Sequence, residues 1–218
     1  GELDYETSQA GHSFVDTTNK HRINECVVID MPYNSTYDSE TFIEQCQMQE
    51  DGLNDMTVKE FLTNYRNYHG DLDHGIEKQG RSKEGSKAQK DYRMAVEETE
   101  KYEAQRDNAI ETDDSITLPK LTPEQAERIK NETKGLAALH NPDQSAGGNG
   151  TEIHAAGAKS INSALGGLWR GRHEELYESI KGQIDQDTEG MSPEEKEQYY
   201  QSTYLHVRLN WHDRKDGL

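Results

Sequence analysis

Residues 160–184, SINSALGGLWRGRHEELYESIKGQI, are the stretch that most clearly decides the fold class. Apolar side chains recur there three and four residues apart, the spacing of one face of an amphipathic helix. They are Ile161, Leu165, Leu168, Trp169, Leu176 and Ile180. Gly166, Gly167 and Gly171 interrupt the pattern, and each weakens a helix by about 1 kcal/mol relative to alanine. We therefore expect one long helix whose glycines permit the close approach of another backbone or a ligand.

Start signals predict further helices on both sides of this stretch. Thr57-Val-Lys-Glu60 and Thr122-Pro-Glu-Gln125 are capping boxes, in which the hydroxyl and the side chain three residues later satisfy helix-end amides. Ser192-Pro-Glu-Glu195 has the same form. The expected elements are a short strand at 27–29, helices at 41–49, from 57, at 91–111, from 122 to about 139, and from 192 to about 211. The sequence thus predicts a mainly α fold.

Polar stretches divide this helical pattern into expected parts. Residues 1–55 are interpreted as an acidic N-terminal extension, partly irregular, and residues 56–218 as an irregular helical domain. Residues 69–90 are rich in Gly, Lys, Asp and Ser, so we expect a mobile loop there. No run approaches the ~20 apolar residues that would span a bilayer.

The composition argues against an ordinary nucleic-acid binder. The 218 residues are 31% hydrophobic and 30% charged, with a formal net charge of −18. Residues 1–60 hold thirteen acidic and three basic side chains. Nucleic-acid binding draws its affinity from Lys and Arg at phosphates. An acidic chain can still act on nucleic acid through a locally positive cleft or a bound metal, and it can also suit a basic protein partner.

Cys26 and Cys46 are too few for a disulfide framework. They could form one disulfide, but two reduced thiols are the simpler interpretation. The polar and acidic residues Gly1 to Thr7 do not resemble a secretory signal peptide.

His140-Asn-Pro-Asp143 places an imidazole and a carboxylate three residues apart on a turn that Pro142 keeps out of a helix. Such a pair can hydrolyse a phosphodiester in two ways. His140 can take a proton from water while Asp143 orients the ring, or both can hold a divalent metal that activates water. The alternative is structural: Asp143 caps the next turn, and His140 ends a helix.

The surroundings of this pair resemble a known family. Residues 138–148, ALHNPDQSAGG, and 160–169, SINSALGGLW, are similar to motifs of the polymorphic toxins called novel toxin 15, or polymorphic toxin type 15. The matching positions are His140, Asp143, Ala146, Gly147, Gly148, Asn162, Ser163, Gly166 and Trp169. Ala164 departs from a serine that is frequent there. The close resemblance covers residues 138–172, and residues 56–62 are less specifically similar.

The resemblance implies a deoxyribonuclease toxin used against competing bacteria. It implies catalytic residues His140 and Asp143, which would also hold a divalent metal, Mg²⁺ being expected. The implied partners are DNA, a cognate immunity protein, and a type VI secretion system or a larger carrier protein. The toxin would be made in the bacterial cytoplasm, exported without a Sec signal, and act in the cytoplasm of the target cell.

Satellite residues have a functional and a structural interpretation each. Asn162 and Ser163 are candidate substrate-binding residues that could equally cap a helix. Arg170 and Arg172 are candidate phosphate clamps, because the guanidinium has forked donors. Arg93, Arg106 and Lys134 could add positive potential. For Trp169, a place in the core is favoured over stacking on a base.

The sequence also allows two rival functions and offers two other His–acid clusters as candidate sites. The chain could be a non-enzymatic acidic interaction module, or a ribonuclease that uses the same pair without metal. The clusters lie at 69–74 (His69, Asp71, Asp73 and His74) and at 206–216 (His206, His212, Asp213 and Asp216). For both clusters, solvated loop or tail is the favoured interpretation.

Overall fold

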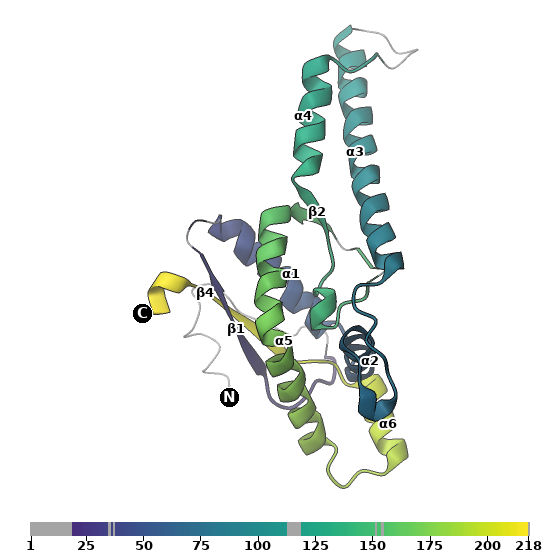
Figure 1. The fold of residues 1–218 in the computed structure, drawn as a ribbon, viewed down its shortest axis with the longest axis vertical. Helices are drawn as coiled ribbons and strands as arrows, with labels where there is room; N and C mark the ends of the chain where they lie inside the picture. Colours follow the sequence, from purple (N-terminus) through teal and green to yellow (C-terminus); the bar gives the residue numbers. More distant parts are fainter. Residues whose placement is uncertain are drawn as a thin grey trace.

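The computed structural model describes residues 19–34, 36, 38–112, 119–150, 152–153 and 155–217, and it confirms a mainly α-helical fold (Figure 1). In chain order the elements are β1 (Val27–Tyr33), α1 (Ser39–Asn54), α2 (Val58–His69), α3 (Lys83–Thr112), α4 (Pro123–Lys134), β2 (Leu136–Leu139), β3 (Ala155–Ala158), α5 (Lys159–Asp187), α6 (Pro193–Ser202) and β4 (Val207–Asp213). Short 3₁₀ helices lie at Leu72–His74, Gln144–Ala146 and Arg214–Gly217. Among these described residues, no helix is both long and apolar enough to cross a membrane.

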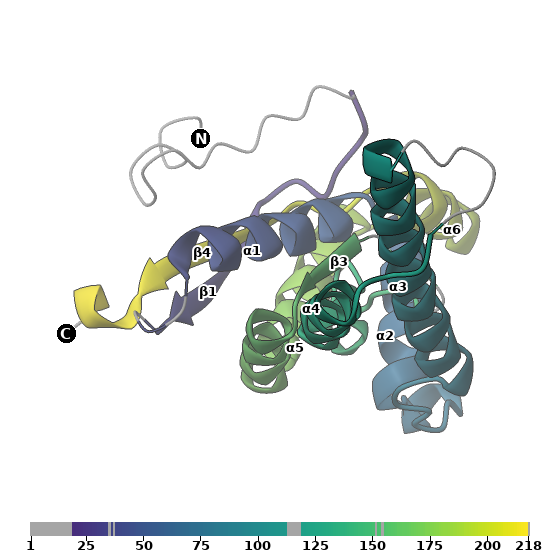
Figure 2. The same ribbon diagram turned by 90° about the horizontal axis from the view of Figure 1, so that it is seen from above.

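The body of the protein is built on a parallel pair of strands, β1 and β4, with Val27 opposite Val207. Alternate β1 side chains, Val27, Ile29 and Met31, are buried, as expected for a strand with one face on a core. Helix α1 packs on β4, and α5 packs on β1. Figure 2 shows α1 running along the strands. The core therefore lies between these strands and the helices α1, α2 and α5.

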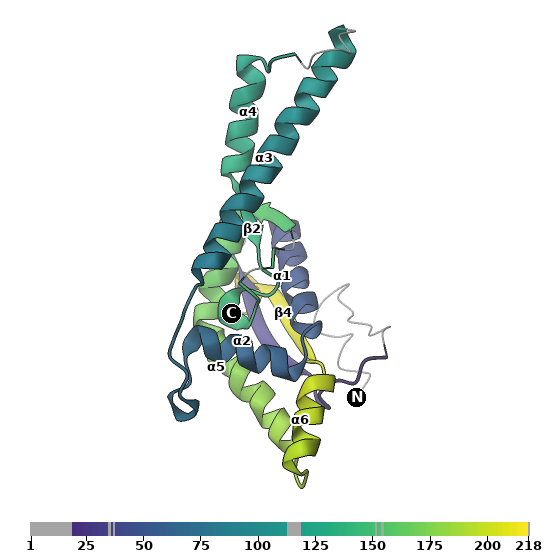
Figure 3. The ribbon, with the colours of Figure 1, turned by 90° about the vertical axis from the view of Figure 1, so that its right-hand side faces the viewer.

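Helices α3 and α4 form an antiparallel hairpin that stands away from the body (Figures 1 and 3). Towards its far end, the side chains of Asn108 and Gln125 exchange two amide hydrogen bonds of 2.8 Å. At its near end, α4 runs into β2, which pairs antiparallel with β3. The hairpin, hereafter the arm, is thus joined to the body next to the motif that starts at His140.

Three expectations about element bounds are wrong. Helix α4 ends at Lys134, and Gly135 forms its C-cap, so residues 136–139 are a strand rather than helix. The last helix ends at Ser202, and residues 207–213 form β4, where V-R-L-N-W alternates apolar and polar side chains. The segment at 69–90 is only partly a loop, because α3 begins at Lys83 and a bridge joins Asp71 to Ile76.

Residues 27–54 share the core with the rest of the chain. Phe42, Cys46 and Leu53 of α1 are fully buried in the same cluster as side chains of α2, α5 and β4. Packing therefore shows no boundary at residue 55 in the described part of the expected extension, and residues 1–18 lie outside the described residues. Cys26 and Cys46 are both free thiols, as the simpler interpretation predicted.

Candidate active site

The segment from His140 to Asp143 is a turn between β2 and the 3₁₀ helix Gln144–Ala146. Asp143 caps that short helix, because its Oδ1 accepts hydrogen bonds from the Ser145 backbone N–H at 3.0 Å and the Ser145 hydroxyl at 2.7 Å. Its other oxygen, Oδ2, makes no hydrogen bond with the described residues. A Cβ atom on Gly166 of α5 would lie 3.6 Å from this Oδ2. Asp143 is therefore a structural cap that still offers one carboxylate oxygen to the space beside α5.

The His140 ring is held by groups other than Asp143. It is only 6% exposed, its Nδ1 lies 2.9 Å from the Glu152 carbonyl oxygen, and its Nε2 lies 3.2 Å from Gln144 Nε2. A carbonyl oxygen can only accept, so the ring donates from Nδ1 to Glu152, and the backbone of Asn149 also hydrogen-bonds to the ring. Burial lowers the pKa of His140, and the Arg81 guanidinium adds to this effect against the opposing influence of Asp143. The imidazole is therefore neutral near pH 7.

A buried amide fixes both ends of this turn. Gln49 of α1, 2% exposed, donates from Nε2 to the His140 carbonyl oxygen at 3.1 Å. Its Oε1 accepts from the Asp143 backbone N–H at 2.7 Å and from Trp169 Nε1 at 3.2 Å. Trp169 itself is fully buried, which confirms it as a core residue. One glutamine thus ties α1 and α5 to the backbone that carries the candidate catalytic pair.

His140 and Asp143 open onto a shared cavity of about 450 Å³, within the range typical of ligand pockets. Three of the four predicted substrate-binding residues, Asn162, Ser163 and Arg170, line the same cavity, as does Arg93 of α3. Helix α5 begins at Lys159 with Ala158 as its N-cap, so Asn162 and Ser163 do not cap it. The structure therefore brings the two halves of the motif, 138–148 and 160–169, onto one cavity.

Arg172, the fourth predicted substrate-binding residue, does not reach this cavity. Its Nε donates to the Asp30 carbonyl oxygen at 2.5 Å, and its Nη1 to the Leu168 carbonyl oxygen at 3.4 Å. Arg172 therefore fastens α5 to β1 and lines a separate cavity of about 260 Å³. Arg106, far along the arm, and Lys134 are also absent from the cavity lining.

The cavity is positively charged although the chain is strongly acidic. Among the described residues, Arg81, Arg93, Lys159 and Arg170 line it, and Asp143 is the one carboxylate in its lining. None of the four cations makes an ion pair or hydrogen bond with another described residue. Unpaired cations gathered around one hollow create a positive potential that attracts anions such as phosphate groups. The locally positive cleft that an acidic nucleic-acid enzyme requires is therefore present.

The donor set suits Mg²⁺ through Asp143 better than through His140. No cluster of three or more His, Cys, Asp or Glu side chains suited to a metal occurs in the described part of the chain. Mg²⁺ is commonly held by one or two carboxylates together with waters and substrate phosphates, and Asp143 Oδ2 meets that requirement. His140 Nε2 faces the Gln144 amide instead. The residues thus fit a metal that is held largely by substrate and water.

The two other His–acid clusters do not gather. His69 Nε2 lies 2.6 Å from the Ser145 carbonyl oxygen, away from the exposed pair formed by His74 and Asp71 at 2.7 Å. At the other end of the chain, His212 Nε2 lies 2.8 Å from Asp30 Oδ1. The side chain of Asp216 lies outside the described set. Neither cluster forms a metal site in the described residues.

Sequence reasoning missed several residues that shape the site. Arg81 was assigned to a mobile loop, although the basic run Arg81-Ser-Lys83 was a signal, and Lys159 directly precedes the second motif. Tyr68 of α2 and Gln49 of α1 carry no local pattern that marks them. Their role depends on neighbours more than 70 residues away, which only the fold reveals.

Comparison with known proteins identifies the family of the chain. The model of the family described as novel toxin 15 matches residues 36–198, which include α1, the arm, both motifs and most of α6. No curated protein matches the chain significantly. Because the family model covers well over half of the sequence, the chain is a member of the novel toxin 15 family of polymorphic toxins.

Proposed function

We propose that this toxin hydrolyses phosphodiester bonds of DNA, with His140 and Asp143 at its reaction centre. The observation that carries the proposal is the cavity that Arg81, Arg93 and Arg170 line together with Asp143, in a chain of net charge −18. Phosphodiester cleavage places extra negative charge on the phosphate, and preorganised cations stabilise that charge where it develops.

In this proposal His140 takes a proton from the attacking water through Nε2. The lowered pKa of the ring favours this, because a neutral imidazole has a free electron pair at pH 7. The ring is held through Nδ1 by the Glu152 carbonyl, so proton uptake at Nε2 needs only the Gln144 amide to turn away. Asp143 would hold Mg²⁺ through its carboxylate, and a metal bound there would supply a lowered pKa of water and neutralisation of phosphate charge.

Toxins of this kind need a protective partner and a route out of the producing cell. We propose a cognate immunity protein, and delivery by a type VI secretion system or as part of a larger carrier protein, with action in the cytoplasm of the competitor. These proposals rest on the family assignment. They are tested by co-purification of the toxin with the product of the adjacent gene and by protection assays in a sensitive strain.

The test of the central proposal is plasmid degradation by the purified protein with Mg²⁺ or with EDTA. His140→Ala and Asp143→Ala should each abolish cleavage and killing while the far-UV circular dichroism stays helical. His74→Ala is the matched control, because His74 is exposed, pairs with Asp71 alone among the described residues and is not part of the cavity lining. Near wild-type cleavage by both cavity variants would overturn the assignment.

Two outcomes would favour the rival functions instead. Degradation of tRNA that persists in EDTA would indicate a metal-independent ribonuclease. Absence of any nuclease activity in a folded protein that binds a basic partner would indicate an interaction module.

A further inference from the structure

One wall of the cavity is aromatic rather than charged. Tyr68, in the last turn of α2, lines the cavity together with Arg81 and is half-buried. Its ring stands edge-on to the His69 ring at 4.7 Å and 62°. His69 in turn stacks on His173 of α5 at 4.0 Å and 12°. Tyr68, a lining residue of the cavity, therefore has a ring that is packed against the rings of His69 and, behind it, His173.

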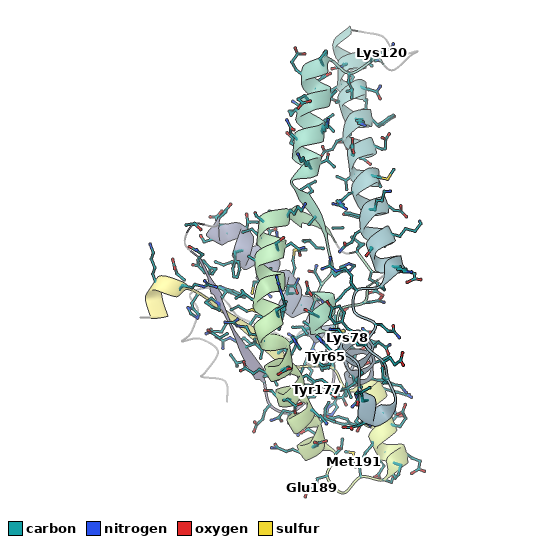
Figure 4. The ribbon with its side chains drawn as sticks, viewed as in Figure 1. Tyr65, Lys78, Lys120, Tyr177, Glu189 and Met191 are labelled. Carbon is teal, nitrogen blue, oxygen red and sulfur yellow. The ribbon has the colours of Figure 1, made fainter. Side chains whose placement is uncertain are left out.

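The packed rings continue between α2 and α5 in the body of the protein. Tyr65 and Tyr177 lie together between α2 and α5 (Figure 4), with parallel rings 4.3 Å apart. The Tyr65 hydroxyl lies 2.7 Å from His173 Nδ1, and His69 Nε2 lies 2.6 Å from the Ser145 carbonyl oxygen. The ring stack is thus tied to the residue that is hydrogen-bonded to Asp143. Tyr68 is held in a fixed position relative to the candidate reaction centre.

The loop after Tyr68 folds back onto the Tyr68 backbone just before Arg81. The Gly80 backbone N–H donates to the Tyr68 carbonyl oxygen at 2.9 Å, and the next residue is Arg81. Gln89 of α3 lines the cavity as well, and so does Asn162 of α5. Neither side-chain amide makes a hydrogen bond with another described residue. The lining of the cavity therefore combines an aromatic side chain, two amide side chains that have no hydrogen-bond partner among the described residues, and cations.

We propose that this cavity contains a nucleobase subsite in which one base of the DNA strand lies on Tyr68. The proposal rests on the proposed function and names the form of its substrate. Every base has a π-face that stacks on an aromatic ring, whereas amide groups pair with base edges. A base inside a duplex is covered by its neighbours in the stack. The substrate strand must therefore present an unpaired nucleotide, either in single-stranded DNA or after extrusion from a duplex.

The test compares two fluorescent probes of equal length and charge, oligothymidylate and an abasic oligodeoxynucleotide. Binding is measured by anisotropy in EDTA, with gel electrophoresis to show that the probes stay intact. A base–aromatic stack typically contributes about 1–3 kcal/mol per base, which converts to roughly a 5- to 150-fold change in affinity. The wild type should bind oligothymidylate at least about fivefold more tightly than the abasic probe. Tyr68→Phe should keep this ratio and Tyr68→Ala should bring it close to one.

Tyr102→Ala is the matched control, because Tyr102 is 54% exposed on the arm and lies outside the cavity lining. It should leave both affinities unchanged. Equal binding of the two probes by the wild type, or an unchanged ratio in a folded Tyr68→Ala, would overturn the base subsite. Cleavage of plasmid by that same protein would leave the proposed function standing. Loss of the proposed function itself would appear separately, as plasmid that stays intact with Mg²⁺.

Discussion

If the proposed nuclease function holds, replacing Gln49 should abolish cleavage although Gln49 is not among the residues that line the cavity. In Gln49→Leu the side-chain volume is nearly kept, but three hydrogen bonds disappear: those to the His140 carbonyl, the Asp143 N–H and the Trp169 indole N–H. A buried polar group left unsatisfied costs about 1–3 kcal/mol. With three such groups, the free energy of unfolding should fall by at least about 3 kcal/mol.

The effect on cleavage should exceed the effect on folding. The Gln49 amide holds the backbone at both ends of the turn from His140 to Asp143, so its loss lets the two side chains shift. A displacement of about 1 Å at a reacting group can reduce the rate about 10²-fold. We therefore expect kcat to fall by about two orders of magnitude in the folded fraction, with a smaller change in KM, because the cations of the cavity are untouched.

Trp169→Phe supplies the control that separates positioning from stability. It removes the indole donor and some core volume, at a cost of about 2–3 kcal/mol, but leaves both bonds from Gln49 to the turn. Urea unfolding gives the stability of each variant, and single-turnover cleavage under conditions where both stay folded gives the rate. If Gln49→Leu and Trp169→Phe lose equal stability and equal activity, Gln49 does not position the site and the reasoning is refuted.

Two further predictions concern pH and close backbone contacts. Burial raises the pKa of Glu50 from 4.5 to about 7. Between pH 4.5 and 7 the folded chain therefore keeps a proton on Glu50 that the unfolded chain releases, so the free energy of unfolding should fall by about 3 kcal/mol as the pH rises through that window. Urea unfolding at pH 5 and pH 8 measures this fall. In Glu50→Gln the fall should be much smaller. Gly148→Ala should destabilise the site loop and abolish cleavage, because its Cβ would lie 1.8 Å from the Pro142 carbonyl oxygen. In Gly171→Ala the new Cβ in α5 would meet nothing within 4 Å, so this change should raise the free energy of unfolding by up to about 1 kcal/mol. Thermal unfolding compares the Gly148 and Gly171 variants, and equal stability of the two would contradict the contact argument.

Helix starts were predictable from the sequence because a cap is a local interaction. Thr57, Thr122 and Ser192 all form the capping boxes that their sequences predict. The hydrogen bonds of such a box join residues three apart, so no knowledge of the fold is needed. The long helix from Lys159 was predictable for a related reason, since its apolar side chains keep helical spacing from Ile161 to Ile180.

The strands were harder because their pairing partners lie far away along the chain. Val27 of β1 pairs with Val207 of β4 across 180 residues, and the four-residue β2 looks like the end of the helix before it. Short apolar runs do not distinguish helix from strand by periodicity alone. Gln49 and Tyr68 could not be predicted as site residues for the same reason. They belong to the site only because the fold places distant segments of the chain beside them.

The net charge did not predict the charge of the site, because it sums regions of the surface whose local charges have opposite signs. Residues 81–93, at the end of the arm nearest the cavity, include five basic and two acidic side chains. Residues 97–107, further out along the arm, include five acidic and two basic side chains. Positive potential is thus concentrated where Arg81 and Arg93 line the cavity, and negative potential lies further out along α3. If the proposed function holds, such a gradient would draw a phosphate backbone toward the cavity and repel it from the outer arm, because local potential rather than net charge acts on a nearby polyanion. In the proposed function, the −18 charge and the four cations that have no ion-pair partner among the described residues belong to one arrangement, in which the rest of the surface would restrict a polyanion to the cavity.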